Sequence, residues 1–332
     1  RLAGARGGST TTLARPEVSG VVGTAASATS IEWTWVDPGG TLSYNVYNST
    51  TGQLIGSSNS NTFSDTGLGV NTTRAIKVAA VTVEGEGLLS ESATVYTLAN
   101  VPGPINPLVT GLSTGSFTLG WTSNGNPFGT NYKVDIYSVD RTTIAFSTST
   151  TDVLLGISGL NASELEFIDI YALNGDAIAS ATMLDGGVAP SSYTRASPPA
   201  GLKVLDTTPF SVSVTWDNNG NPSNVPYQVT YSTDKFATHI ATAVPFSAGF
   251  NGSATTITGL LTSTTYWVRV VARNPYGHET SFSGIVSTIT FNGGAALGAL
   301  AGPLEADHDS RIEGTITIGA SPGYRTIDFR SP

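Results

Sequence analysis

The chain has 332 residues, a length that suggests two to four domains; only 12% of them are charged, and the formal net charge is −9. It contains no cysteine, so disulfide frameworks and cysteine-based metal sites are excluded, and the acidic balance argues against a nucleic-acid partner. With 39% hydrophobic residues and aromatic side chains along its whole length, the chain can fill folded cores and is not a disordered acidic tail.

The first fifteen residues differ from the rest of the chain. They are rich in Gly and Thr, contain three Arg and no acidic residue, and offer only Leu2 and Leu13 as large apolar side chains. Such a segment cannot fill a core of its own. We therefore expect residues 1–15 to form an N-terminal arm without independent structure.

From residue 16 onwards one pattern recurs three times. Each copy has an alternating apolar run that ends in a Trp, then a run opened by a Tyr, then a third run that follows a Gly-Leu pair. Alternation with period two is typical of half-buried strands, and short strands separated by turns favour an antiparallel β-sandwich. The aromatic residues predicted to lie in the three cores are Trp35, Trp121, Trp216, Tyr44, Tyr132, Tyr227 and Tyr266.

The third copy carries the most specific signature. In residues 255–272 a Gly-Leu pair precedes Tyr266 and an alternating run, and this segment resembles a fibronectin type III domain. The resemblance implies an all-β fold of three tandem fibronectin-type-III-like (immunoglobulin-like) sandwiches in a bacterial-type extracellular or surface protein. It also implies a tyrosine corner, in which the hydroxyl of Tyr266 bonds to upstream backbone. At the same offset the first two copies have Arg74 and Glu166, so we expect their corners to be built differently.

Stretches that contain Pro separate the three copies. They lie at residues 15–16, 101–104 and 197–199. Because Pro fixes φ and lacks an N–H donor, it is common at the start of edge strands and stiffens short linkers. The predicted organisation is the arm at 1–15, domains at 16–99, 100–195 and 196–291, and a C-terminal extension at 292–332.

The second and third copies share the motif Asn-Gly-Asn-Pro shortly after the Trp. It occupies residues 124–127 and 219–222. Asn-Gly accommodates positive φ, and Asn-Pro favours a turn. Two interpretations stay open: a loop retained through duplication, and a ligand-binding loop.

Two alternating runs, at residues 311–318 and 324–329, predict two short strands in the C-terminal extension. Two strands alone are marginally stable and need a sheet to join. We therefore expect a non-enzymatic extracellular structural subunit that self-assembles into a filament, sheath or surface layer, with the arm and the terminal strands pairing with neighbouring copies. The alternative is a monomeric adhesion, carbohydrate-binding or spacer module of a larger secreted protein, with surface glycans as partners.

No pattern of catalytic or metal-ligating residues stands out. The three histidines, His239, His278 and His308, lie in no metal-binding spacing, and there is no nucleophile or phosphate-loop motif. The densest polar cluster, at residues 307–309, lacks the further acids of a calcium loop, so a solvated linker and a weak cation site both stay open. We predict no enzyme activity, cofactor or metal. No apolar stretch reaches the roughly 18–20 residues needed to span a membrane.

Surface features fit an extracellular or cell-surface chain. Asn-x-Ser/Thr sequences permit glycosylation, and they place acceptors at Asn48, Asn71, Asn161 and Asn251. Aromatic residues in predicted loops either stack on sugars or pack within loops and interfaces; these are Phe128, Phe236, Phe250 and Tyr276.

Overall fold

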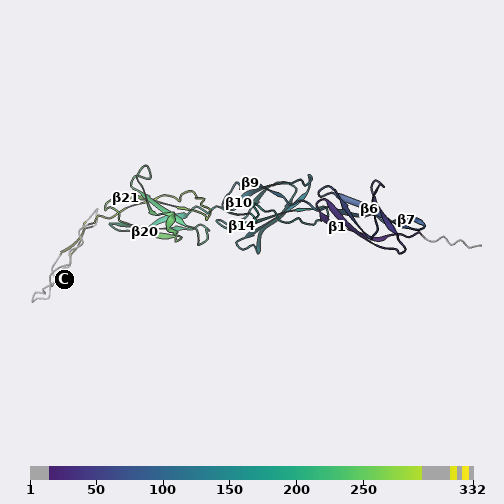
Figure 1. The fold of residues 1–332 in the computed structure, drawn as a ribbon. Coiled ribbons are helices and arrows are strands. Elements are labelled where there is room, and N and C mark those ends of the chain that lie inside the picture. Colours follow the sequence, from purple (N-terminus) through teal and green to yellow (C-terminus); the bar gives the residue numbers. More distant parts are fainter. Residues whose placement is uncertain (1–14, 294–314, 320–323, 329–332) are drawn as a thin grey trace, which may run out of the picture. The chain divides into compact units, whose positions relative to one another are not determined.

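A computed structural model of the chain describes residues 15–293, 315–319 and 324–328. Three β-sandwiches follow one another along the chain, each built from two antiparallel sheets (Figure 1). The predicted all-β class with three tandem sandwiches is thereby confirmed. Nearly all of the predicted N-terminal arm and the cluster at residues 307–309 lie outside the described residues.

In the first sandwich, one sheet has the strand order β1-β2-β5 and the other β4-β3-β6-β7, with β8 also paired to β6. Alternation explains the inward face of β2, where Ile31, Trp33 and Trp35 are buried and the residues between them are exposed. The strands are β1 (Ser19–Ser27), β2 (Ser30–Val36), β3 (Ser43–Asn48), β4 (Leu54–Ser58), β5 (Thr62–Thr66), β6 (Thr73–Thr82), β7 (Gly85–Leu89) and β8 (Ala93–Tyr96).

The second sandwich repeats this plan with sheets β13-β10-β9 and β12-β11-β14-β15. Every second residue of β14 is buried, from Glu166 through Ile168 and Ile170 to Ala172. The strands are β9 (Gly103–Thr110), β10 (Ser116–Thr122), β11 (Asn131–Ser138), β12 (Thr143–Thr150), β13 (Leu154–Ser158), β14 (Leu165–Leu173) and β15 (Ser191–Tyr193).

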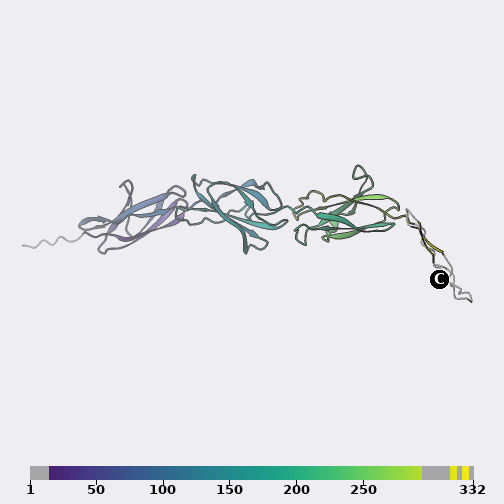
Figure 2. The same ribbon diagram turned by 180° about the vertical axis from the view of Figure 1, so that it is seen from behind.

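The third sandwich has sheets β16-β17-β20 and β19-β18-β21-β22. Among the described residues the single helical element is the 3-10 turn η1 (Phe246–Ala248), and the rear view shows strands and loops throughout (Figure 2). The strands are β16 (Ala200–Thr207), β17 (Ser211–Asp217), β18 (Tyr227–Ser232), β19 (Ile240–Val244), β20 (Ala254–Thr258), β21 (Thr265–Ala272) and β22 (Val286–Ile289).

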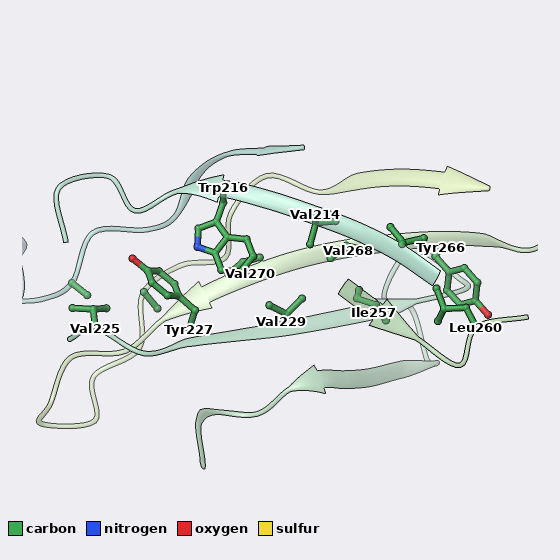
Figure 3. Packing of buried hydrophobic residues seen from close by; sticks show 13 residues of the cluster. Val214, Trp216, Val225, Tyr227, Val229, Ile257, Leu260, Tyr266, Val268 and Val270 are labelled. Atoms are coloured by element: carbon green, nitrogen blue, oxygen red, sulfur yellow. The ribbon is translucent and has the colours of Figure 1, made fainter. Parts of the chain in front are cut away.

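The core of the third sandwich lies between its two sheets. Figure 3 shows Trp216 beside Tyr227 at one end of this core and Tyr266 beside Leu260 at the other. Valines of β17, β18 and β21 fill the space between these aromatic ends, as the alternation in the sequence predicts. An edge-to-face contact joins Trp216 to Tyr227, with ring centroids 5.6 Å apart.

The residue at the position of Tyr266 differs among the three sandwiches. In the third sandwich the hydroxyl of Tyr266 accepts a hydrogen bond from the backbone N–H of Leu261 at 2.9 Å, which is the geometry of a tyrosine corner. In the first, Arg74 forms a half-buried ion pair with Asp65 at 2.6 Å. Glu166 occupies the same position in the second and is completely buried.

Residue contacts group the chain into two compact units. The first unit contains the first sandwich and most of the second. The other contains the third sandwich together with Leu112–Ser116, Gly159–Leu165 and the chain from Tyr193 onwards. The residues around the first linker, 97–102, belong to the first unit, and those around the second linker, 194–199, belong to the other.

Two further strands lie in the C-terminal extension. β23 (Thr315–Gly319) and β24 (Tyr324–Asp328) form an antiparallel pair in which Thr315 is opposite Asp328. Within the described part of the chain, each of these strands pairs only with the other.

Candidate functional site

Each sandwich ends in a buried threonine that ties its last strand to an earlier loop. The Oγ1 atoms of Thr97, Thr194 and Thr290 each accept a backbone N–H from that loop at 3.0 to 3.1 Å. Each also donates to a loop carbonyl at 2.6 to 2.7 Å. Because the same two bonds occur three times, we infer that this threonine fixes the point at which the chain leaves each sandwich.

The Asn-Gly-Asn-Pro motif holds the linker that precedes its own sandwich. The side-chain amide of Asn126 accepts the backbone N–H of Asn100 and donates to the carbonyl of the same residue, both at 2.8 Å. Asn221 makes the same pair of bonds to Ser197, at 2.7 and 2.8 Å. One amide therefore satisfies both backbone groups of one linker residue, as a neighbouring strand would.

The other asparagine of the motif binds the next linker residue. Asn124 donates to the carbonyl of Val101 at 2.8 Å, and Asn219 donates to that of Pro198 at 3.0 Å. Both asparagines have positive φ, 51° and 54°. Asn tolerates this left-handed conformation better than most residues, which explains why Asn rather than another donor stands there.

A third asparagine, on the loop after β14 or β21, reaches the buried threonine from the other side. The Nδ2 of Asn174 donates to the carbonyl of Thr97 at 3.2 Å, and that of Asn274 donates to the carbonyl of Thr194 at 3.0 Å. Asn174 and Asn274 are buried. We call each set of linker, Asn-Gly-Asn-Pro motif and third asparagine a clasp: the first clasp contains Asn124, Asn126 and Asn174, the second Asn219, Asn221 and Asn274.

The clasps consist of neutral groups. Asn126 and Asn221 lie next to the core phenols Tyr132 and Tyr227, and burial raises the pKa of both phenols above the ordinary value. The phenols therefore stay protonated well beyond neutral pH. Hydrogen bonds between neutral amides and the backbone are not screened by salt in the way surface ion pairs are.

The first clasp has an additional asparagine, Asn71, from the first sandwich. Its Nδ2 donates to Thr130 at 3.0 Å, and its Oδ1 accepts the backbone N–H of Gly175 at 2.9 Å. A Cβ on Gly175 would lie 2.4 Å from the ring of Tyr96, so this close approach requires glycine. In the second clasp an edge-to-face contact between Tyr193 and Tyr276, with centroids 4.8 Å apart, occupies the corresponding place.

The linker side of each clasp has a repeated sequence of its own, outside the motifs described above. Tyr-Thr-x-Ala occurs at residues 96–99 and again at 193–196, directly before each linker. The first sandwich has Asp37-Pro-Gly-Gly where the other two have Asn-Gly-Asn-Pro, in a loop two residues shorter between Trp and Tyr. The motif is thus found in the two sandwiches that follow a linker of this kind.

Comparison with known proteins gives the family of the third sandwich. The fibronectin type III domain model matches residues 197–289. The third sandwich is a fibronectin type III domain. The first two repeat its sheets and its Trp-Tyr core contact, and the chain is a tandem fibronectin type III protein.

One curated relative is named Exoglucanase B, from Cellulomonas fimi. It is 28% identical over 285 residues, which cover 82% of this chain and 25% of the relative, so the chain spans about a quarter of that protein. Among solved structures, a two-domain fibronectin type III segment of chicken tenascin has a TM-score of 0.40 at 17% identity and covers 57% of this chain and all of that segment. The FN1-FN3 domains of chicken CNTN1 have a TM-score of 0.26 at 15% identity. That match covers 83% of this chain and 99% of the CNTN1 segment.

The predicted core residues all lie inside the three fibronectin type III domains. None of these side chains is more than 4% exposed, in the set Trp35, Trp121, Trp216, Tyr44, Tyr132, Tyr227 and Tyr266. Within residues 15–293, no group of three or more His, Asp and Glu residues is arranged to hold a metal ion. The described residues also contain no helix that is long and apolar enough to cross a membrane.

The four predicted glycosylation acceptors have different surroundings. Asn161 is exposed, and the Oδ1 of Asn48 caps its own turn. The Nδ2 of Asn251 donates to the carbonyl of Ser223, and that of Asn71 is bound within the first clasp. A glycan on either of the last two would replace a donor that the fold uses; glycosylation itself stays a prediction.

Three of the four loop aromatics are packed against other side chains. Phe250 contacts Trp216 with centroids 6.2 Å apart, Tyr276 contacts Tyr193, and Phe236 lies 4.1 Å from the guanidinium of Arg269. The fourth, Phe128, is fully exposed.

Proposed function

We propose that this chain is a non-enzymatic spacer within a longer extracellular protein, in which each clasp restrains the linker that precedes its own domain. The observation that carries the proposal is the pair of bonds from Asn126 to both backbone groups of Asn100, repeated by Asn221 at Ser197. A linker bound in this way loses the freedom that a flexible connection has.

Two observations support a secreted spacer rather than an enzyme. Fibronectin type III domains are non-catalytic modules, and the relative named Exoglucanase B matches over only a quarter of its length. We infer an extracellular location from the same relative.

Small-angle X-ray scattering on the whole chain tests the spacer proposal. The scattering curve of the parent should be fitted by a narrow set of conformations. The curve of the double variant Asn126→Asp, Asn221→Asp should require a broader set, because Asp keeps the acceptor of each bond pair and loses the donor. Asn224→Ala, an exposed residue of the same loop in the third domain, is the matched control. Equal scattering from parent and double variant would contradict the proposal.

Self-assembly is the second candidate, and one observation favours it. Among the described residues, β23 and β24 pair only with each other, so each leaves an edge open to another strand. The candidate predicts filaments in electron micrographs that disappear when residues 292–332 or residues 1–15 are deleted. A particle of one chain's mass by light scattering, in the parent and in both deletions, would rule it out.

A further inference from the structure

A cavity of about 430 Å³ opens beside the first clasp, within the first compact unit. This volume falls in the range of small-molecule sites, roughly 300–1,000 Å³. Its lining residues include two aromatic residues, Tyr96 and Phe128, and three asparagines, Asn71, Asn131 and Asn174. None of the lining residues carries a charge at neutral pH.

Phe128 is the unusual member of this lining. It follows directly on the clasp motif, and its side chain is fully exposed, whereas the other loop aromatics are packed against neighbours. An exposed aromatic ring on the rim of a cavity offers an apolar plane at low conformational cost, because only two side-chain torsions need to be fixed.

The cavity is framed by groups that are already held in place. Asn71 bonds to Thr130 and Gly175, and Asn174 bonds to Thr97. Asn131, by contrast, is exposed at the lining. A ligand would therefore meet a preformed wall and one adaptable amide, which limits the ordering cost of binding.

We propose that this cavity binds a neutral oligosaccharide, with one sugar ring stacked on Phe128 and its hydroxyls bonded to the amide of Asn131 and to the backbone around it. A sugar ring has an apolar C–H face and a rim of hydroxyl groups, which matches an aromatic plane beside amides. The uncharged lining residues offer no partner of opposite charge to an anionic or a cationic ligand. This site goes beyond the spacer role and does not depend on it.

The second clasp provides an internal comparison. Ser223 stands there in place of Phe128, Val225 in place of Thr130 and Pro275 in place of Gly175. Val225 is completely buried in the core of the third domain. The second clasp therefore holds its linker without a counterpart of the fully exposed Phe128, and its ring of Tyr276 is packed on Tyr193. The combination that we assign to sugar binding is confined to the first clasp.

Calorimetric titration of the whole chain with cellohexaose, xylohexaose, mannohexaose and hyaluronan hexasaccharide tests the site. At least one neutral hexaose should bind saturably, and Phe128→Ser, which installs the residue of the second clasp, should weaken that binding about tenfold, because it removes the aromatic face on which the sugar ring packs. Asn131→Ala should weaken it less. Phe210→Ala removes an exposed Phe from the third domain and should leave binding unchanged.

Three results would overturn this proposal: no saturable binding of any neutral hexaose at concentrations up to about 1 mM, undiminished binding by Phe128→Ser, or binding of the charged hexasaccharide alone. Circular dichroism of each variant checks that the domains remain folded. Because Phe128 makes none of the clasp bonds described above, failure here leaves the scattering test of the spacer role unaffected.

Discussion

One buried tryptophan, Trp216, contributes much of the packing that stabilises the third domain. Trp216 is 4% exposed and packs edge-to-face on Tyr227 and Phe250. Its indole N–H is buried and has no hydrogen-bond partner among the described protein atoms. The residue therefore stabilises the third domain by packing, while its polar atom contributes nothing and costs desolvation.

Trp216→Ala should lower the free energy of unfolding of the third domain by about 3–5 kcal/mol, the usual cost of deleting a large buried aromatic. Trp216→Phe should cost less, because it keeps a ring in place and removes the unpaired N–H. Urea unfolding followed by far-UV circular dichroism measures both. A phenylalanine variant as unstable as the alanine variant would show that the indole N–H matters.

The phenol of Tyr171 makes the folded state less stable at high pH. Burial, reinforced by the carboxylate of Asp169, raises the pKa of Tyr171 to about 12 from its ordinary 10.0. The fold thus favours the protonated phenol, and the stabilisation is fully present below pH 10 and is lost as the pH rises towards 12.

The midpoint of thermal unfolding should therefore fall as the pH rises from about 10 to 12, and Tyr171→Phe should reduce that fall. Tyr132 and Tyr227 add to the effect in the same direction, because burial raises their pKa as well. Scanning calorimetry at several pH values gives the comparison. A midpoint that is constant over this range would contradict the assignment.

At the scale of the element, the loop after β14 fits against the last strand of the first domain only because Gly175 has no side chain. Gly175→Ala would bring a Cβ to 2.4 Å from the ring of Tyr96, so ring and loop must separate. Gly156→Ala on β13 is the matched control, since an added Cβ there meets nothing within 4 Å.

Gly175→Ala should destabilise the first pair of domains, whereas Gly156→Ala should be neutral or slightly stabilising through its effect on the unfolded chain. Thermal unfolding of the two variants beside the parent measures the difference. If both alanines had the same small effect, the close contact between Tyr96 and Gly175 would not hold this junction.

The strands were predictable because their signal is local. Alternation around Trp35, Trp121 and Trp216 places every second side chain in a core, and the segment that contains Tyr266 indicates its corner. The ion pair of Arg74 with Asp65 was not predicted, because periodicity identifies which face a residue occupies and not which polar partner it meets there.

Over the whole molecule, the sequence predicted one side of each clasp, the Asn-Gly-Asn-Pro motif, and not the linker residues that it binds. The Asn-Gly-Asn-Pro motif stands out, but Asn126 binds a residue 26 positions earlier, and no local pattern names such a partner. The repeated Tyr-Thr-x-Ala before each linker is the sequence feature that could have indicated the linker side of the clasp. Together the two motifs indicate that what recurs along this chain is a junction as well as a domain.

The distance between the first two domains shows whether the first clasp fixes their relation. Because the chain has no cysteine, Asn59→Cys and Ser149→Cys can carry a pair of spin labels at exposed positions in a background free of other thiols. Pulsed electron paramagnetic resonance should give a narrow distance distribution in the parent and a clearly broader one after Asn126→Asp and Asn174→Ala. A broad distribution that is the same with and without the clasp asparagines would show that the first clasp does not hold these two domains.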